Sequence, residues 1–255
     1  SYGNREYPRG GLKYSWGSGL SERFRSWKVI SQLLDTKSGS SFSLIMTKFT
    51  SKDVSLFFFP PFLLQVVELI SSAIGDLVQG IYYENSRSSE NCLTDDIGIS
   101  TWKEQVFLSH SALLAKSCQA AMELAKHSAE IQDMAFRYGK HMSMSHKLHS
   151  DLQPFVKESS SDATAFSLNC APAVLHQEFL GRDAWIKQIR EAQGKGNLMD
   201  YKKLQEAIKA GKGVTSAIDL CRCHGNRALA ALESFPPSEA RAALANIVHA
   251  VTRFS

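Results

Sequence analysis

The sequence predicts an all-α protein over most of its length, from residue 66 to the C-terminus. Apolar residues in this part recur at spacings of three and four, which places them on one face of a helix. No convincing two-residue alternation, the pattern of a half-buried strand, interrupts them. Glycines, proline pairs and a serine-rich stretch separate the helical segments. These patterns together indicate a helical bundle.

Length and composition fit a globular protein with a sizeable core. The chain has 255 residues, 44% of them hydrophobic and 21% charged, so wholesale disorder is not expected. The net charge of +4 is too small and too scattered to favour nucleic acid as a partner. Five cysteines, an odd number in a chain this long, favour a reducing compartment over a secreted disulfide framework. We expect no transmembrane segment, because Pro60, Pro61, Gln65 and Glu68 interrupt the longest apolar run.

The first 65 residues lack the helical periodicity and are rich in Ser, Gly, Lys and Arg. Residues 55–65 can be encoded by a pyrimidine-rich tract that ends in CAG, the signal that precedes an exon at a splice acceptor. We therefore interpret residues 1–65 as translated intron or an alternative exon, poorly ordered; a hydrophobic linker is the alternative. The chain begins at Ser1 and not at Met, so its true N-terminus is expected upstream and no targeting peptide can be read.

Two long helices are expected at the start of the periodic part. The apolar stripe over residues 66–81 predicts the first, and the polar residues 84–96 predict a loop after it. Thr101 and Glu104 have the spacing of a capping box, so a second helix is expected to begin there and to run to about residue 127.

A third long helix is expected from Ser128, a suitable N-cap, to Pro154, which cannot continue a helix. Three short helices are expected to follow it, at residues 173–179, 183–193 and 200–210.

Two more helices complete the predicted bundle. Residues 214–235 form the first, and Pro236 and Pro237 end it. Ser238 is expected to cap the second, which should lock the bundle rather than form a tail. The apolar face of this last helix consists of Leu244, Ile247, Val248 and Val251.

Candidate metal ligands are few. Asp95 and Asp96 are the only adjacent acidic pair, and paired carboxylates can hold Mg²⁺ against a diphosphate. Just ahead of a helix start they also favour the helix dipole, so capping or solvation is the expected role. Three histidines share one predicted helix without carboxylates at a metal-binding spacing, and we expect surface or partly buried roles for His141, His146 and His149.

Two further clusters resemble binding motifs without having their full pattern. Cys221 and Cys223 lie two residues apart in a predicted helix and point to opposite sides, so with His224 they are not expected to chelate a metal. Residues 211–216 resemble a phosphate-binding loop but lack the preceding strand and the first glycine. No catalytic triad and no basic patch with interleaved aromatic residues is found.

Four stretches carry a resemblance to a known family: residues 98–105, 179–183, 211–220 and 235–255. With them, the chain from Val66 onward resembles the trans-polyprenyl diphosphate synthases, and among these the second subunits of the heteromeric decaprenyl enzymes. Residues before 66 do not match. The resemblance implies an isoprenoid-synthase-type helical bundle that is incomplete at its N-terminal side.

In active members of that family, two Asp-rich motifs hold Mg²⁺ on an allylic diphosphate, and isopentenyl diphosphate attacks the allyl centre as the diphosphate leaves. The first motif lies upstream of the matching region. The second is expected at residues 150–154, where only Asp151 remains of three carboxylates and Pro154 occupies the third position. Asp95 and Asp96 lie at neither motif position.

Other positions also depart from the active pattern. Ser109 and His110 replace a Lys-Thr pair that contacts diphosphate in active members. His146 and Lys147 replace a Phe-Gln pair, and Gly80-Ile81 stands where active members have Gly-Glu. We therefore expect this chain to be catalytically silent alone, with no catalytic, cofactor-binding or metal-binding residues of its own.

The resemblance implies that the chain is a fragment or splice form of the non-catalytic subunit of a heteromeric synthase, which makes the prenyl tail of ubiquinone. The expected partner is catalytic subunit 1, in a heterotetramer of the mitochondrial matrix, with Mg²⁺ on that partner. Subunit contact is expected to centre on residues 66–84. The alternative is a helical interaction protein without a role in prenyl transfer.

Overall fold

The computed structural model describes residues 61–87, 98–156, 165–193 and 199–254, which all belong to one compact unit, Phe59–Ser255. In chain order its helices are α3 (Pro61–Arg87), α4 (Ile99–Val106), the π-helix η2 (Phe107–Ser111), α5 (Ala112–Leu124), α6 (Ala129–Val156), α7 (Ala171–Leu180), α8 (Arg182–Ala192), α9 (Tyr201–Ala210), α10 (Gly213–Leu232) and α11 (Glu239–Thr252). The described residues contain no β-structure beyond one isolated bridge between Gln193 and Met199. The all-α prediction is therefore confirmed.

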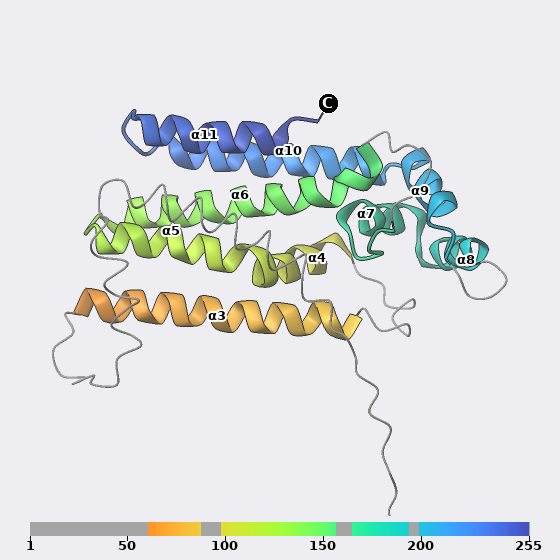
Figure 1. Cartoon of the computed structure of the whole chain (residues 1–255), viewed down its shortest axis with the longest axis horizontal. Helices are drawn as coiled ribbons and strands as arrows, with labels where there is room; N and C mark the ends of the chain where they lie inside the picture. The colour runs from red at the N-terminus through yellow and green to blue at the C-terminus, as the bar shows by residue number, and fades with distance from the viewer. Residues whose placement is uncertain (1–60, 88–97, 157–164, 194–198, 255) are drawn as a thin grey trace, which may run out of the picture. The chain divides into compact units, whose positions relative to one another are not determined.

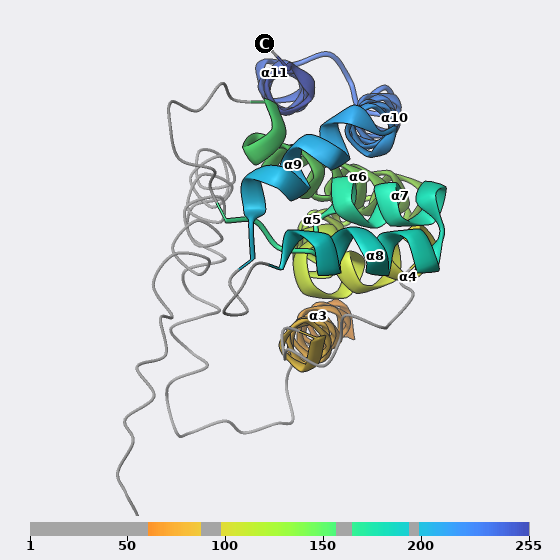
Figure 2. The ribbon, with the colours of Figure 1, turned by 90° about the vertical axis from the view of Figure 1, so that its right-hand side faces the viewer.

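The long helices pack as successive layers, with α3 against α5, α5 against α6, and α6 against α10 (Figure 1). Helix α11 covers α10 and also contacts α6. Figure 2 looks towards the end of these layers where α7, α8 and α9 gather. There α7 packs against α10, α4 and α6, while α8 and α9 pack against α7.

Three apolar clusters hold the layers together. The first joins α4, α6, α7 and α10 around the fully buried Leu148 and Cys221. The second joins the C-terminal end of α6 to the three short helices around Leu204 and Ile208. The third joins α6, α10 and α11 around Val248. Burying an aliphatic side chain of this size contributes about 1.5–3 kcal/mol, so these clusters are the main source of stability.

The first helix extends beyond its predicted bounds at both ends. Helix α3 begins at Pro61, and proline is well tolerated at the first position of a helix because its missing N–H would be unpaired there in any case. The helix continues to Arg87, so the loop predicted from residue 84 begins later than expected. The rest of that loop, with Asp95 and Asp96, lies outside the described residues, as does the predicted 1–60 segment.

The predicted capping box is wrong. Helix α4 begins at Ile99, and its N-cap is Gly98, which provides no side-chain cap. A distant carboxylate substitutes for the local one, because the backbone N–H of Ile99 donates to Glu178 Oε2 at 3.0 Å. The helix start is therefore fixed by contact with α7, which local sequence does not reveal.

The predicted single helix to residue 127 is interrupted. The π-helix η2 separates α4 from α5, and α5 ends at Leu124. The turn that follows places Lys126 in the left-handed region, with a φ of 59°. This conformation ends the helix before α6 begins at Ala129.

Pro154 does not end its helix. Helix α6 continues to Val156, and the side-chain amide of Gln205 donates to the Pro154 carbonyl oxygen. A donor from α9 thus satisfies one of the carbonyl groups that a helix C-terminus leaves unpaired. Helix α10 also ends earlier than predicted, at Leu232 rather than residue 235. The predicted cap at Ser238 is confirmed, since its side chain accepts a hydrogen bond from the Arg241 N–H at 3.1 Å.

One helix in the described part of the chain is long and apolar enough to cross a membrane by length and composition alone, Leu63–Glu84 within α3. The prediction that polar residues break this run was wrong, because Gln65 and Glu68 leave the average hydropathy of the segment high. An interface helix meets the same criterion, so the segment is not thereby a membrane span. Several of its large side chains are exposed: Leu64, Ile74, Val78, Tyr82 and Tyr83.

Candidate functional site

The residues expected at the second acidic motif lie at the C-terminal end of α6. Asp151 is buried, and both of its carboxylate oxygens have partners within the protein. Lys147 Nζ donates to Asp151 Oδ1 at 2.5 Å, and the Ala171 N–H donates to Oδ2 at 2.9 Å. The one remaining carboxylate of the motif is therefore used to join α6 to the start of α7.

Opposing influences act on the Asp151 carboxyl. Burial raises its pKa, while the ion pair with Lys147 and the Ala171 N–H lower it. The nearby carboxylate of Glu84 raises the pKa further, which places α3 close to this end of α6. Lys147 is thus the cation that compensates the buried charge.

The residues that replace the Lys-Thr pair lie on η2 and face α3. Ser109 Oγ donates to Glu84 Oε1 at 2.7 Å, and His110 Nδ1 lies 3.3 Å from the same oxygen. The two helices approach closely because Gly80 has no side chain: a Cβ there would lie 2.4 Å from the Ser109 backbone nitrogen. Ser109 and His110 are therefore engaged with α3 rather than directed at a ligand.

Mg²⁺ does not fit the residues at this place. The ion requires near-octahedral oxygen ligands, and protein sites offer it free carboxylate oxygens. Asp151 has neither oxygen free, and Lys147 places a positive charge beside it. Within the described residues, no group of three or more His, Cys, Asp or Glu side chains is arranged to hold a metal ion.

The three histidines of α6 do not come together. His146 is exposed, and His149 stacks on Phe254 with ring centroids 5.4 Å apart. His141 instead pairs with His224 of α10, with 3.0 Å between their Nδ1 atoms. Sequence reasoning missed this pair because the two residues lie on helices far apart in the chain.

Burial keeps the histidine pair neutral. It lowers the pKa of His141 to about 4 and that of His224 to about 3, with nearby cations adding to the effect. The hydrogen bond between them therefore needs one Nδ1 as donor and the other as acceptor. Cys221 is buried and Cys223 exposed, so the predicted opposite orientation of these two side chains is confirmed.

The glycines of the rejected phosphate loop have a packing role. A Cβ on Gly213 would lie 2.3 Å from the Pro172 carbonyl oxygen, and one on Gly211 would lie 2.4 Å from His176 Nδ1. Glycine at both positions lets the start of α10 pack directly against α7. This contact explains the residue types without a phosphate ligand.

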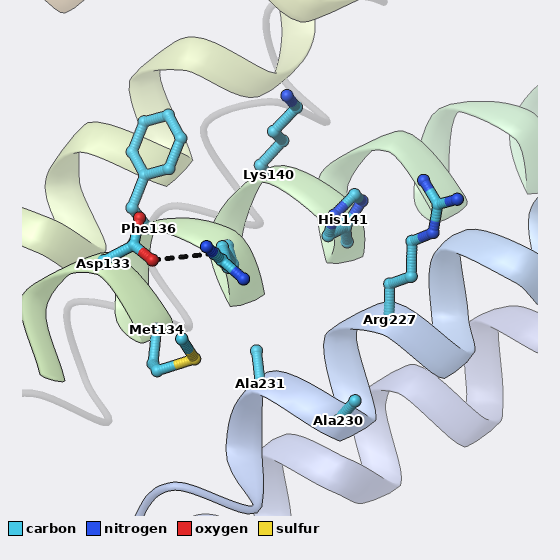
Figure 3. A pocket seen from close by; sticks show the side chains of 9 residues that line it. Asp133, Met134, Phe136, Lys140, His141, Arg227, Ala230 and Ala231 are labelled. Atoms are coloured by element: carbon cyan, nitrogen blue, oxygen red, sulfur yellow. Dashed lines mark ion pairs between the residues drawn. The ribbon is translucent and has the colours of Figure 1, made fainter. Parts of the chain in front are cut away.

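A pocket of about 560 Å³ lies between α6 and α10, away from the acidic-motif position (Figure 3). The only ion pair within its lining joins Arg137 Nε to Asp133 Oδ2 at 2.7 Å. Sequence reasoning did not select this pocket, because its residues come from two helices without a shared motif. It is lined by Asp133, Met134, Phe136, Arg137, Lys140, His141, Arg227, Ala230 and Ala231.

Comparison with known proteins gives this geometry its context. No family model matches the chain. Human all trans-polyprenyl-diphosphate synthase PDSS2 is 76% identical over 191 residues, which cover 75% of this chain and 48% of that protein. The matching part of this chain belongs to the trans-polyprenyl diphosphate synthase family. The chain spans about half the length of the curated relatives it matches.

More distant members of the trans-polyprenyl diphosphate synthase family match the same way. Rice solanesyl-diphosphate synthase 1, mitochondrial, is 25% identical over 69% of this chain and 40% of its own length. An Arabidopsis medium/long-chain length prenyl pyrophosphate synthase superposes with a TM-score of 0.58 at 26% identity, over 74% of this chain and 64% of that one. The predicted isoprenoid-synthase-type bundle is therefore confirmed.

Proposed function

We propose that this chain acts as a non-catalytic subunit of a heteromeric trans-polyprenyl diphosphate synthase, which makes the prenyl tail of ubiquinone from an allylic diphosphate and isopentenyl diphosphate. The observation that carries the proposal is the internal use of Asp151. In a catalytic subunit this position would present an oxygen to Mg²⁺; here it is paired with Lys147 and the Ala171 N–H. The place of the reaction is the mitochondrial matrix, in line with the name of the rice relative.

The chemistry explains why this arrangement is silent. A departing diphosphate must be stabilised by cations as the allyl centre becomes positive, and a cluster of carboxylates collects those cations. Lys147 supplies one charge, but that charge is already neutralised by Asp151. The metal is accordingly assigned to the catalytic partner, subunit 1 of the synthase, in a heterotetramer.

The face that meets the partner is the outer side of α3. Ile74, Val78 and Tyr82 follow one another at helical spacing and are 53%, 63% and 70% exposed. Val66 and Ala73, on the other side of the helix, are buried. The predicted apolar stripe therefore has two sides, one for the internal bundle and one free. Stable heteromer interfaces are more apolar than ordinary surface, which fits the free side.

Co-purification with the catalytic subunit tests this interface. Val78→Glu should abolish co-purification while leaving the helical circular dichroism signal intact, because Val78 contributes little to the internal core. Gln79→Glu adds the same charge at the next exposed position and serves as the matched control. Equal binding of both variants, or no binding by the unmodified chain, would leave the chain a helical interaction protein unrelated to prenyl transfer.

Activity measurements test the catalytic assignment. The purified chain should show no prenyl transfer from an allylic diphosphate to isopentenyl diphosphate with Mg²⁺ present. Turnover that persists after removal of contaminating synthases, and disappears in Asp151→Ala, would overturn the proposal.

A further inference from the structure

The pocket between α6 and α10 is separate from the acidic-motif position. Lys140, at its edge, lies eleven residues before Asp151 on the same helix. An α-helix rises about 1.5 Å per residue, so the two positions are about 16 Å apart along α6. No part of the proposed subunit role accounts for this pocket.

Unbalanced positive charge gathers in the pocket from two helices. Arg137 and Lys140 come from α6 and Arg227 from α10, and the single lining carboxylate, Asp133, is paired with Arg137. Lys140 and Arg227 have no ion pair with a carboxylate anywhere in the part of the chain that the structure describes. Lys140 Nζ instead lies 5.2 Å from the centre of the Phe107 ring.

The electrostatic effect on His141 supports this convergence. Besides burial, three cations lower its pKa: Lys140, Arg227 and Arg137. Their fields therefore reach one point, the inner wall of the pocket. A site of that kind lowers the free energy of an anion placed in it.

The floor of the pocket has a different character. Met134, Ala230 and Ala231 contribute apolar surface below the cationic side chains (Figure 3). The volume of about 560 Å³ is larger than a phosphate needs and lies in the range of small-molecule sites. The pocket thus combines an anion-attracting rim with room for an attached organic group.

We propose that this pocket binds a phosphate or diphosphate group carried by an apolar molecule, with Arg227 and Lys140 as the residues that contact the anion. Guanidinium and ammonium groups donate strong charge-assisted hydrogen bonds to phosphate oxygens. Met134 and the two alanines contact the apolar part. The anion has two sources, a soluble diphosphate or the headgroup of an acidic phospholipid.

Binding by the full chain, without its partner, tests the proposal independently of the subunit role. Inorganic pyrophosphate is titrated by calorimetry, and vesicle co-sedimentation compares phosphatidylcholine alone with phosphatidylcholine containing phosphatidic acid. Arg227→Gln should weaken binding of the recognised probe about tenfold, as expected for loss of one charge-assisted hydrogen bond. Lys140→Gln should have a similar effect.

Arg190→Gln, an exposed arginine of α8, removes the same charge elsewhere and is the matched control. Pyrophosphate binding that is weakened only by the pocket variants assigns the soluble source. Binding confined to vesicles with phosphatidic acid, again weakened only by the pocket variants, assigns the lipid source. Absence of binding to both probes, or equal weakening by Arg190→Gln, would overturn the proposal. Unchanged circular dichroism spectra confirm that the variants fold.

Discussion

Asp151 illustrates how a neighbouring side chain decides what a carboxylate can do. One helical turn before it stands Lys147, and the resulting ion pair occupies an oxygen that would otherwise be available to a ligand. The Ala171 N–H occupies the second oxygen. A residue that suggests metal binding in a sequence is thereby converted into a structural link between two helices.

Removing Lys147 should therefore destabilise the fold. In Lys147→Met the buried carboxylate of Asp151 loses its compensating charge, and breaking a buried ion pair from one side costs about 3 kcal/mol. The free energy of unfolding in urea measures the loss. Lys187→Met is the matched control, because Lys187 forms an exposed pair with Glu191 at 4.0 Å, with Lys187 79% exposed. Its cost should stay below about 1 kcal/mol, and equal costs would contradict the structural role of Asp151.

The His141–His224 pair should make the protein sensitive to acid. Both folded-state pKa values lie below the ordinary 6.5, at about 4 and about 3. Between pH 6.5 and 4 the unfolded chain thus binds more protons than the folded one, and stability falls as the pH falls. The cations that face the pair from α4, α6 and α10 are Lys103, Arg137, Lys140 and Arg227.

Thermal unfolding of His224→Gln across this pH window tests the effect. The variant should lose less stability on acidification than the unmodified chain. Asp151 contributes with the opposite sign, because its raised pKa makes the folded chain bind more protons, so the comparison between variants isolates the histidines. His127→Gln changes an exposed histidine and should not alter the pH dependence. Identical pH profiles for the two variants would contradict the assignment.

At the scale of single residues, the sequence reveals identity but not spatial partnership. The loss of carboxylates around Asp151 could be predicted, because the motif is local in the chain. The contacts of Glu84 with Ser109 and His110 could not, because they join separate helices. The same limit applies to His224, for which no sequence signal indicated a partner on α6.

At the scale of helices, α3 contains two glycines with contrasting surroundings. A Cβ at Gly80 would lie 2.4 Å from the Ser109 backbone nitrogen, whereas a Cβ at Gly75 would meet nothing within 4 Å. Gly80→Ala should therefore lower stability by about 1–3 kcal/mol through overpacking. Gly75→Ala should raise it by up to about 1 kcal/mol, because alanine is the better helix former. Melting temperatures that move in the same direction would contradict the close approach of α3 and η2.

Helix positions were predictable where local chemistry decides them. The cap at Ser238 and the cap at Asp200, whose side chain accepts from the Lys203 N–H at 3.0 Å, both depend on neighbours in sequence. The start of α4 depends on Glu178, and the extension of α6 past Pro154 is supported by Gln205. These boundaries are set by tertiary contacts, which periodicity does not encode.

At the scale of the whole molecule, α11 closes the bundle against α10 and α6. Of the four apolar residues predicted to be buried on it, Val248 is fully buried, while Leu244, Ile247 and Val251 are only partly so. The stabilisation is therefore smaller than full burial of all four would give. Tyr138 adds a contact from α6, since its hydroxyl donates to the Leu244 carbonyl oxygen at 3.3 Å.

Truncation after Pro237 should still destabilise the protein. Loss of Val248 alone removes about 1.5–3 kcal/mol of burial, and the third apolar cluster would become exposed to water. The expected result is a lower midpoint of urea unfolding and loss of partner binding, although no residue at the acidic-motif position is removed. A truncated chain with an unchanged midpoint and unchanged partner affinity would show that α11 is an appendage.

The π-helix η2 contains one residue more than an α-helix would need to cover the same length. Each residue turns an α-helix by about 100°, so losing one residue from Phe107–Ser111 would rotate α4 relative to α5 by that angle. Either Ser109 would turn away from Gly80, or Trp102 would leave the apolar cluster it now shares with α6. When relatives are aligned, a one-residue gap in this segment therefore indicates a changed seat for α3, and with it a changed outer face, rather than a neutral difference in length.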